Sequence, residues 1–500
     1  MSAGRALAFP TVAAIATAPG RGAIAVLRVS GPDALAVAGR VAHPWPPAPR
    51  RATLCALRDG EGRLLDRALV TAFPAPASYT GEDVVELATH GGSAVPASVL
   101  AALVAAGAEP APPGEFTRRA VLNGRLDLVQ AEAVGDLVDA RSGAMQGAAL
   151  AQLDGGLSRR VGALRDALLD VEALLAYDID FPEEDAGPLA RERVTAAAAR
   201  VRDQLAALLA TAPAGAVVRD GAVVVIAGAP NAGKSSLFNA LLGERRAIVT
   251  EVAGTTRDAV DAMLDARPWP LRLVDTAGLR AAQDVVERLG IEVSEQWLGR
   301  AAVVLACGDT PGGVAATAAR VRTLTSAPVV EVWTKRDAGA EAVWEAPAEA
   351  PAEADADAPA DPAGRDGEAR GAPPNGTIAP PVAPGTILPT PAASPPLEVS
   401  AETGRGLRAL VEAVQGALAG RLAAPPADVP LVTRARHQRA LAEARDEVAA
   451  FLAAWEAGAL PAPVAAVHVR AAVAALDDLI GTVDVEEILG RLFATFCVGK

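Results

Sequence analysis

The apolar residues in the first 120 positions occur in short runs that end at turn signals. Residues 23–29 form one such run, which is closed by Gly31-Pro32. Short apolar runs bounded by Gly and Pro are typical of β-strands. Residues 99–106 have the pattern of a helix. We therefore predict an N-terminal α/β or α+β domain over residues 1–122.

From about residue 126 the apolar residues follow a helical period, and a second helical block runs from about residue 433 to the end. Spacings that alternate between four and three residues place side chains on one face of a helix. The clearest such face consists of Leu157, Val161, Leu164, Leu168, Val171 and Leu175. The two blocks predict one discontinuous helical domain, residues 123–216 plus 425–500, around an inserted domain at 217–424.

The inserted domain contains apolar runs of strand length, at residues 223–227, 271–274, 328–333 and 397–399. They predict an α/β domain with a parallel-type sheet. The chain as a whole is then an α/β multidomain protein. Its 500 residues exceed what one hydrophobic core organises, which also favours two or three domains.

One segment of the inserted domain has a different composition. Residues 338–396 are almost entirely Ala, Pro, Gly, Glu and Asp, with nine acidic residues against two arginines. Such a segment buries too little apolar surface to offset the entropy of ordering, so we expect a disordered insertion. It carries half of the net charge of −14, and the remainder of the chain is close to neutral. Wholesale electrostatic capture of nucleic acid is therefore not expected, but a local basic patch is allowed.

The compartment follows from the cysteines and the N-terminus. Cys55, Cys307 and Cys497 are scattered without a CxxC pair, which favours neither a disulfide framework nor a zinc site. Cys307 lies in an apolar run and is expected in a core. Arg5 followed by residues 6–18 imitates a signal peptide, but Pro10 interrupts the stretch. No apolar run is long enough for a membrane span. We expect a cytoplasmic protein that does not enter a membrane.

The clearest chemical signal is the run GAPNAGKS at positions 228–235, directly after the apolar run 223–227. It fits the phosphate-binding loop G-x-x-x-x-G-K-[ST] in its usual place between a strand and a helix. In such loops, backbone N–H groups surround the phosphates, and the lysine, here Lys234, reaches the β- and γ-phosphate oxygens. The hydroxyl of Ser235 is expected to ligate Mg²⁺.

Further motifs follow in the order that a GTP-hydrolysing protein requires. Gly254-Thr-Thr256 is placed as a switch loop, and Asp275-Thr-Ala-Gly278 follows a strand and can hold Mg²⁺ through water. In Thr334-Lys-Arg-Asp337, the final carboxylate can accept from guanine N1–H and the exocyclic amine, a pairing that adenine cannot satisfy. The backbone N–H groups at Ser400-Ala401 can reach the guanine O6. Together these motifs predict GTP and not ATP.

The position after Gly278 holds Leu279, where regulatory GTPases have a glutamine that orients water. Hydrolysis therefore needs another group that stabilises the charge of the transition state, and the sequence assigns no arginine finger. Asn231, inside the phosphate loop, is either a ligand for a monovalent cation that replaces such a finger or a simple turn residue.

These residues together resemble the tRNA modification GTPase family MnmE or TrmE, within the TrmE-Era-EngA-like GTPases. The resemblance covers nearly the whole chain except the acidic insertion. Its most specific pieces outside the nucleotide motifs are Pro19-Gly-Arg-Gly22, Tyr79-Thr-Gly-Glu-Asp83, His90-Gly-Gly92, Pro113-Gly-Glu-Phe116, Asn123-Gly-Arg-Leu-Asp-Leu128, Gln130-Ala-Glu-Ala133, Asp178-Ile-Asp-Phe-Pro182 and the terminal Phe496-Cys-Val-Gly-Lys500.

The resemblance implies an N-terminal domain that forms a homodimer and binds 5-formyl-tetrahydrofolate or a related one-carbon tetrahydrofolate. By motif position the folate contacts are Arg28, Glu86, Arg125 and Lys500. The family usually has lysine at the position of Arg125. From the residues alone, Arg28 and Arg125 read as surface charge. Cys497 matches a family cysteine near the folate site, and it is either a functional thiol or a packed terminal one.

The resemblance also implies a potassium-dependent GTPase. K⁺ would be bound by Asn231, Thr250, Val252 and Thr255, and Mg²⁺ by Ser235 and Thr256. Glu287 matches the glutamate that orients the attacking water, and acts in catalysis with Lys234 and Thr256; from the residues alone it is equally an exposed charge. The predicted guanine-nucleotide contacts are Asn231, Ala232, Gly233, Lys234, Ser235, Ser236, Thr250, Glu251, Val252, Ala253, Gly254, Thr255, Thr256, Asp275, Thr276, Ala277, Gly278, Thr334, Lys335, Asp337, Ser400 and Ala401.

The implied reaction adds an aminomethyl-type group, such as carboxymethylaminomethyl, to C5 of the wobble uridine (U34) of certain tRNAs. The chain has no G-x-G-x-x-G loop for a dinucleotide, so FAD would lie on a partner, by resemblance MnmG (GidA), in a hetero-oligomer. GTP hydrolysis would drive conformational cycling. The alternatives are a switch GTPase for ribosome assembly, which needs a basic RNA-binding module, and a folate-binding scaffold. The only basic cluster is Arg434, Arg436, His437 and Arg439.

Overall fold

The computed structural model describes residues 9–180, 191–246, 260–275, 296–337, 395–422, 429–457, 462–481 and 499. The chain forms two compact units. Unit 1 comprises Met1–Gly221, Asp265–Pro270 and Arg421–Lys500, and unit 2 comprises Ala222–Leu264 and Leu271–Gly420. The predicted disordered insertion lies outside the described residues except for its last two positions. No helix in the described part of the chain has the length and apolarity needed to cross a membrane.

The N-terminal part of unit 1 is a seven-stranded sheet in the order β3-β4-β5-β6-β2-β1-β7. All pairs are antiparallel except β1 with β7. Helices α1 and α2 cover one face and share its core, whereas alternate residues such as Val26 and Arg28 of β2 lie on the other face, called here the open face. The elements are β1 (Val12–Ile15), β2 (Ile24–Ser30), α1 (Ala34–Val41), β3 (Ala42–His43), β4 (Thr53–Arg58), β5 (Leu64–Phe73), β6 (Val84–His90), α2 (Ala94–Ala105) and β7 (Glu109–Pro110).

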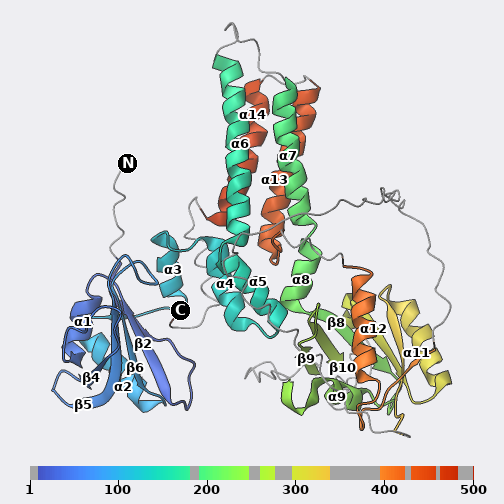
Figure 1. Ribbon diagram of the computed structural model, residues 1–500, viewed down its shortest axis with the longest axis horizontal. Helices are drawn as coiled ribbons and strands as arrows, with labels where there is room; N and C mark the ends of the chain where they lie inside the picture. Colours follow the sequence, from blue (N-terminus) through green and yellow to red (C-terminus); the bar gives the residue numbers. More distant parts are fainter. Residues whose placement is uncertain are drawn as a thin grey trace, which may run out of the picture. The chain divides into compact units, whose positions relative to one another are not determined.

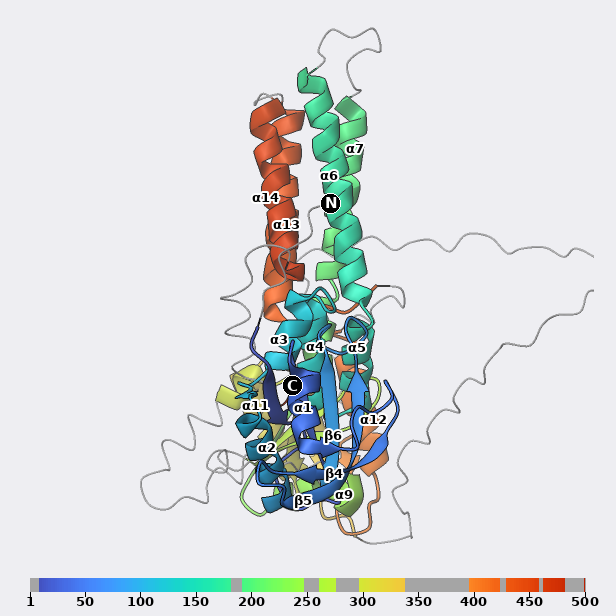
Figure 2. The ribbon, with the colours of Figure 1, turned by 90° about the vertical axis from the view of Figure 1, so that its left-hand side faces the viewer.

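The helical part of unit 1 combines segments from before and after unit 2. Figures 1 and 2 show α6, α7, α13 and α14 side by side, and their buried residues form one core. The predicted helical face is confirmed, because its six members on α6 are each at most 1% exposed. The helices are α3 (Glu115–Leu122), α4 (Leu128–Asp139), α5 (Gly143–Leu153), α6 (Gly156–Asp180), α7 (Arg191–Leu209), α8 (Ala212–Asp220), α13 (Ala435–Glu456) and α14 (Ala462–Ile480).

Unit 2 is built on a six-stranded sheet in the order β13-β12-β11-β8-β10-β9. Every pair is parallel except β9 with β10, which confirms the parallel-type sheet. In such sheets ligands bind outside the carboxyl ends of the strands. The elements are β8 (Ala222–Gly228), α9 (Lys234–Arg246), β9 (Val260–Leu264), β10 (Leu271–Asp275), β11 (Val303–Gly308), α11 (Pro311–Leu324), β12 (Val329–Trp333), β13 (Leu397–Glu398) and α12 (Leu407–Ala419).

Candidate nucleotide-binding site

The phosphate-binding loop connects the end of β8 to the start of α9. A Cβ atom added to Gly228 would lie 2.5 Å from the carbonyl oxygen of Cys307 on β11, so the strand can end here only with glycine. Cys307 itself is fully buried, and burial raises the pKa of its thiol to about 12. This confirms the expected core position of Cys307. Asn231 adopts a left-handed φ of 62°, as a turn residue would.

Lys234 and Ser235 occupy the first turn of α9 and point back to the loop and the sheet. The Lys234 ammonium donates to the carbonyl oxygens of Gly228 at 3.0 Å and Ala229 at 2.7 Å. These bonds hold the cation at the mouth of the loop, where helix N–H groups also favour anions. The pair is therefore placed to bind phosphate, as the motif predicts.

Ser235 also meets the predicted magnesium-binding aspartate. Its hydroxyl donates to Oδ2 of Asp275 at 2.7 Å, and Asp275 is buried at the end of β10, the strand that pairs in parallel with β8. Hydroxyl and carboxylate oxygens are the donors that Mg²⁺ prefers. The donor set fits this ion, and its further predicted ligand, Thr256, lies outside the described residues.

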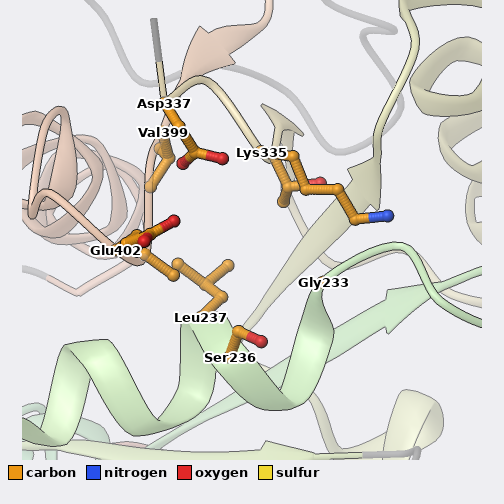
Figure 3. A pocket seen from close by; sticks show the side chains of 9 residues that line it. Gly233, Ser236, Leu237, Lys335, Asp337, Val399 and Glu402 are labelled. Carbon is orange, nitrogen blue, oxygen red and sulfur yellow. The ribbon is translucent and has the colours of Figure 1, made fainter.

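A cavity of about 180 Å³ lies beside the phosphate loop and contains the predicted guanine-recognition residues. Figure 3 shows Asp337, Lys335 and Glu402 around this cavity, with Ser236 and Leu237 on α9. The cavity is lined by Gly233, Ser236, Leu237, Thr334, Lys335, Asp337, Val399, Ala401 and Glu402. Loops after β8, β12 and β13 thus meet at one edge of the sheet.

Thr334 connects this cavity to the phosphate loop. Its buried hydroxyl lies 2.8 Å from the carbonyl oxygen of Ala232 and 3.0 Å from that of Gly308. The resembling family usually has asparagine at this position. The structure shows that the hydroxyl makes the contact with the loop.

Asp337 is held by a residue that follows it by 63 positions. The hydroxyl of Ser400 donates to Oδ1 of Asp337 at 2.6 Å and accepts from the backbone N–H of Thr403 at 3.1 Å. Ser400 is completely buried, so this orientation is rigid. The oriented carboxylate can accept hydrogen bonds from guanine, as the motif predicts.

Sequence reasoning missed three residues that line the cavity: Leu237, Val399 and Glu402. It also did not predict that the Arg336 guanidinium, next to Lys335 and Asp337 in the chain, lies 4.1 Å from the centre of the Trp333 ring. Glu402 directly follows Ser400-Ala401, and this adjacency to a predicted guanine contact could have identified it. For Leu237 and Val399, apolar residues within regular elements, the sequence gives no such signal.

Several predicted site residues lie outside the described part of the chain. They are Thr250, Glu251, Val252, Ala253, Gly254, Thr255, Thr256, Thr276, Ala277, Gly278, Glu287, Cys497 and Lys500. The potassium site and the catalytic glutamate therefore stay predictions.

Two of the predicted folate contacts, Arg28 and Glu86, lie side by side on the N-terminal sheet. Arg28 on β2 and Glu86 on β6 are cross-strand partners, and Nη2 and Nε of Arg28 lie 2.8 and 3.0 Å from the same carboxylate oxygen. The Arg28 guanidinium also lies 5.2 Å from the centre of the Tyr79 ring and 5.4 Å from that of Phe116. Arg28 is thus not a free surface charge, because a carboxylate and two aromatic rings orient it.

Arg125 lies beside the loop that contains Tyr79. A Cβ atom added to Gly81 in this loop would lie 3.3 Å from Cγ of Arg125. Arg119, which is fully buried, holds this loop through Glu82. Its guanidinium lies 3.0 Å from Glu82 and 2.8 Å from Glu115. Sequence reasoning did not single out Arg119. Glu82 and Glu115, which belong to two of the motifs that resemble the family, form ion pairs with it.

Gly499 of the C-terminal motif lies against the same sheet. A Cβ atom on Gly499 would lie 2.4 Å from the carbonyl oxygen of Ile15, at the end of β1. Ile15 is the cross-strand partner of Leu27, the residue before Arg28. The terminus therefore approaches the strand pair that contains Arg28.

Three of the four residues of the predicted basic cluster form ion pairs inside the helical part, and the fourth, Arg439, is exposed on α13. Arg434 lies 2.5 Å from Asp136, Arg436 lies 2.9 Å from Glu132, and Nε2 of the buried His437 lies 2.5 Å from the same glutamate. Burial raises the pKa of the Glu132 carboxyl, but the hydrogen bonds from His437 and Arg436 outweigh it and lower that pKa to about 2. These charges stabilise the contact between α4 and α13.

A parallel sheet with this loop, this buried aspartate and this base cavity defines a P-loop protein of the guanine-nucleotide-binding class. Comparisons with known proteins agree. Residues 11–125 match the family model of the GTP-binding protein TrmE N-terminus, and residues 128–497 match that of the MnmE helical domain. The chain therefore belongs to the MnmE family of tRNA modification GTPases.

Similar curated proteins extend over the whole chain. A tRNA modification GTPase MnmE from Akkermansia muciniphila is 39% identical, with 98% of this chain and 99% of that protein covered. Those from Azoarcus sp. and Methylobacterium sp. are each 42% identical; both alignments cover 98% of this chain, and 98% and 99% of the relative. The likeness thus includes both units.

Proposed function

We propose that the protein hydrolyses GTP to drive the modification of tRNA. The observation that carries the nucleotide assignment is the pair Asp337–Ser400, which lies in a cavity joined by Thr334 to the phosphate loop. The tRNA assignment is supported by family membership over the whole chain. A ribosome-assembly switch is less well supported, since Arg434, Arg436 and His437 are occupied by internal ion pairs.

In this proposal Lys234 neutralises the β- and γ-phosphates, and Asp337 selects the base. Ser235 and Asp275, with Thr256, would hold Mg²⁺, which supplies positive charge to the phosphate oxygens. Asn231, Thr250, Val252 and Thr255 would hold K⁺ in place of an arginine finger, and Glu287 would orient the attacking water. Pre-positioned charge of this kind is usually the largest contribution to such catalysis.

The proposed reaction on tRNA is the addition of an aminomethyl-type group to C5 of the wobble uridine, in the cytoplasm. The flavin chemistry belongs to an FAD-containing partner, MnmG (GidA), in a hetero-oligomer. The one-carbon tetrahydrofolate would bind at Arg28, Glu86, Arg125 and Lys500. The described part of this set supports the proposal, because a charged pair beside Tyr79 and Phe116 suits a flat polar ring such as a pterin.

The open face of the N-terminal sheet supports self-association with a second copy of the chain. Leu54 and Leu69 are cross-strand partners on β4 and β5, and both side chains are exposed, at 61% and 49%. Their row continues through Ala88 and Val26 on β6 and β2. Ala88 and Val26 are half-buried, so the row is apolar along its length and most exposed at Leu54 and Leu69. Exposed apolar surface of this kind marks interaction sites. We infer that this face contributes to a homodimer.

The first experiment measures GTP hydrolysis by the purified protein in KCl and in NaCl of equal ionic strength. Stimulation by K⁺ that is lost in Asn231→Ala would support the potassium mechanism. Equal rates in both salts would exclude that mechanism and leave GTP hydrolysis itself in place. Incubation with the FAD partner, tRNA and 5-formyl-tetrahydrofolate then tests the modification directly, and absence of modified uridine would contradict it.

A further inference from the structure

The chain segments that enter and leave unit 2 are bonded to each other within unit 1. Helix α8 ends at Asp220, and β8, the strand that carries the phosphate loop, begins at Ala222 with a single residue between them. After α12 the chain returns to unit 1, where residues 429–434, called here the exit segment, precede α13. The exit segment packs against α8 and the residue before it.

Thr211, immediately before α8, bonds the exit segment through its buried hydroxyl, which accepts from the backbone N–H of Val432 at 3.0 Å. The one hydroxyl hydrogen faces two acceptors, the carbonyl oxygen of Leu208 at 2.7 Å and that of Pro430 in the exit segment at 3.3 Å. On α5, Nε2 of Gln152 donates to the carbonyl oxygen of Leu431 at 3.2 Å. These bonds satisfy backbone groups of the exit segment, which would otherwise be costly to bury.

Gly215 on α8 allows the closest approach. A Cβ atom at this position would lie 2.2 Å from the carbonyl oxygen of Val432 and 3.2 Å from Cα of Thr433. The obstacle is backbone, not the end of a flexible side chain, so it cannot move aside without separating α8 from the exit segment. Every side chain larger than hydrogen is therefore excluded at this position.

The exit segment is also continuous with the charged contact between α4 and α13. Arg434 ends the exit segment, Arg436 and His437 lie in the first turn of α13, and all three are bonded to Asp136 or Glu132 of α4. Helix α8, the exit segment, α4 and the first turns of α13 thus form one bonded block. Hydrogen bonds and ion pairs therefore connect α8 to α13 through the exit segment.

We propose that Thr211 and Gly215 are positioning residues that transmit the nucleotide state of unit 2 to α13. Two independent linkers would absorb a displacement of unit 2, because each could change its own backbone angles. Linkers bonded to each other instead pass the displacement of α8 on to the exit segment and the first turns of α13. This inference rests on the proposed function, in which GTP hydrolysis drives the modification of tRNA.

Gly215→Ala tests the inference, with Gly147→Ala as the matched control. Both are helical glycines, but a Cβ atom at Gly147 on α5 would meet nothing within 4 Å. We expect Gly215→Ala to keep GTP hydrolysis within about threefold while tRNA modification with the FAD partner falls by about tenfold or more, within the usual range of coupling factors. Gly147→Ala should retain both activities.

A second pair of variants separates positioning from folding. Thr211→Ser keeps the hydroxyl and should preserve tRNA modification, whereas Thr211→Val removes it and should lower modification about as much as Gly215→Ala does. Equal modification by the serine and valine variants would overturn the inference, as would full modification by Gly215→Ala.

Hydrogen exchange gives a readout that does not depend on tRNA. In the wild type, addition of GTP should change the exchange of backbone amides at residues 435–440, and in Gly215→Ala this response should be lost. A wild-type protein that hydrolyses GTP without modifying tRNA would contradict the proposed function, while the exchange response would still decide the coupling. An identical response in the wild type and Gly215→Ala would contradict the coupling alone.

Discussion

The hydroxyl of Thr334 lies 2.8 Å from the carbonyl oxygen of Ala232 and thereby joins the base-binding motif to the phosphate loop. The two residues are 102 positions apart, and the contact is buried. The base cavity and the phosphate site therefore cannot move independently, and a nucleotide that fits one is aligned with the other.

Thr334→Val should weaken binding of both GTP and GDP, because it removes the hydroxyl and leaves the Ala232 carbonyl without this donor. Loss of one buried hydrogen bond costs about 1–2 kcal/mol, or roughly five- to thirtyfold in Kd. Titration with a fluorescent guanine nucleotide measures the effect. Thr334→Ser is the control and should bind normally, and equal affinities for the serine and valine variants would show that the contact does not align the nucleotide.

Asp337→Asn should change the base that the protein prefers. The introduced amide N–H and the exocyclic amine of guanine are both donors and cannot bond each other. The same N–H can donate to the 2-oxo group of xanthine. We expect GTP affinity to fall about a hundredfold or more, since a mismatched polar site discriminates strongly, and XTP to bind better than GTP. Competition between the two nucleotides measures this. Asp203→Asn, on the surface of α7, is the control, and an unchanged preference for GTP in Asp337→Asn would refute the base assignment.

Glu132 should make the stability of the helical part depend on pH. Its pKa is lowered from 4.5 to about 2, despite burial, by hydrogen bonds from His437 and Arg436. A lowered folded-state pKa stabilises the fold above the unfolded-state pKa, and this stabilisation is lost as pH falls from about 4.5 toward 2. The free energy of unfolding should decrease by an amount on the order of 3 kcal/mol across this window.

Urea unfolding followed by helical circular dichroism between pH 5 and 2 measures that decrease. Glu132→Gln should show a smaller slope with pH than the wild type, although it is less stable at neutral pH. Glu61→Gln, at an exposed position, should retain the wild-type slope. A Glu132→Gln slope equal to that of the wild type would mean that other groups cause the acid sensitivity.

Arg28→Met should impair binding of 5-formyl-tetrahydrofolate and leave GTP hydrolysis within about twofold. A lost charge-assisted hydrogen bond is worth about 1.5–3 kcal/mol, which predicts at least about tenfold weaker binding. Calorimetry measures this affinity. Arg63→Met is the control, because the Arg63 side chain is 76% exposed. If Arg28→Met binds the folate as tightly as the wild type, Arg28 is not a folate contact and only orders Glu86.

Much of the site was determined by contiguous sequence. The phosphate loop, the aspartate after β10 and the guanine motif are short segments, and their chemistry depends on the residue types and on the strand before each of them. The face of α6 was likewise predictable, since the helical period is a local property of the chain. Cys307 could be assigned to a core from the apolar run around it.

The tertiary structure alone decided which distant residues meet. Sequence placed Arg434, Arg436, His437 and Arg439 in a basic cluster. Only the packing of α13 on α4 shows that the first three have acidic partners about 300 positions away. The same holds for Arg28 with Glu86, and for Thr211 with Val432. Periodicity reports which face of an element is buried, but not which element covers it. Strand order, register and helix packing settle that choice, because they minimise the free energy of the whole fold and not of any one segment.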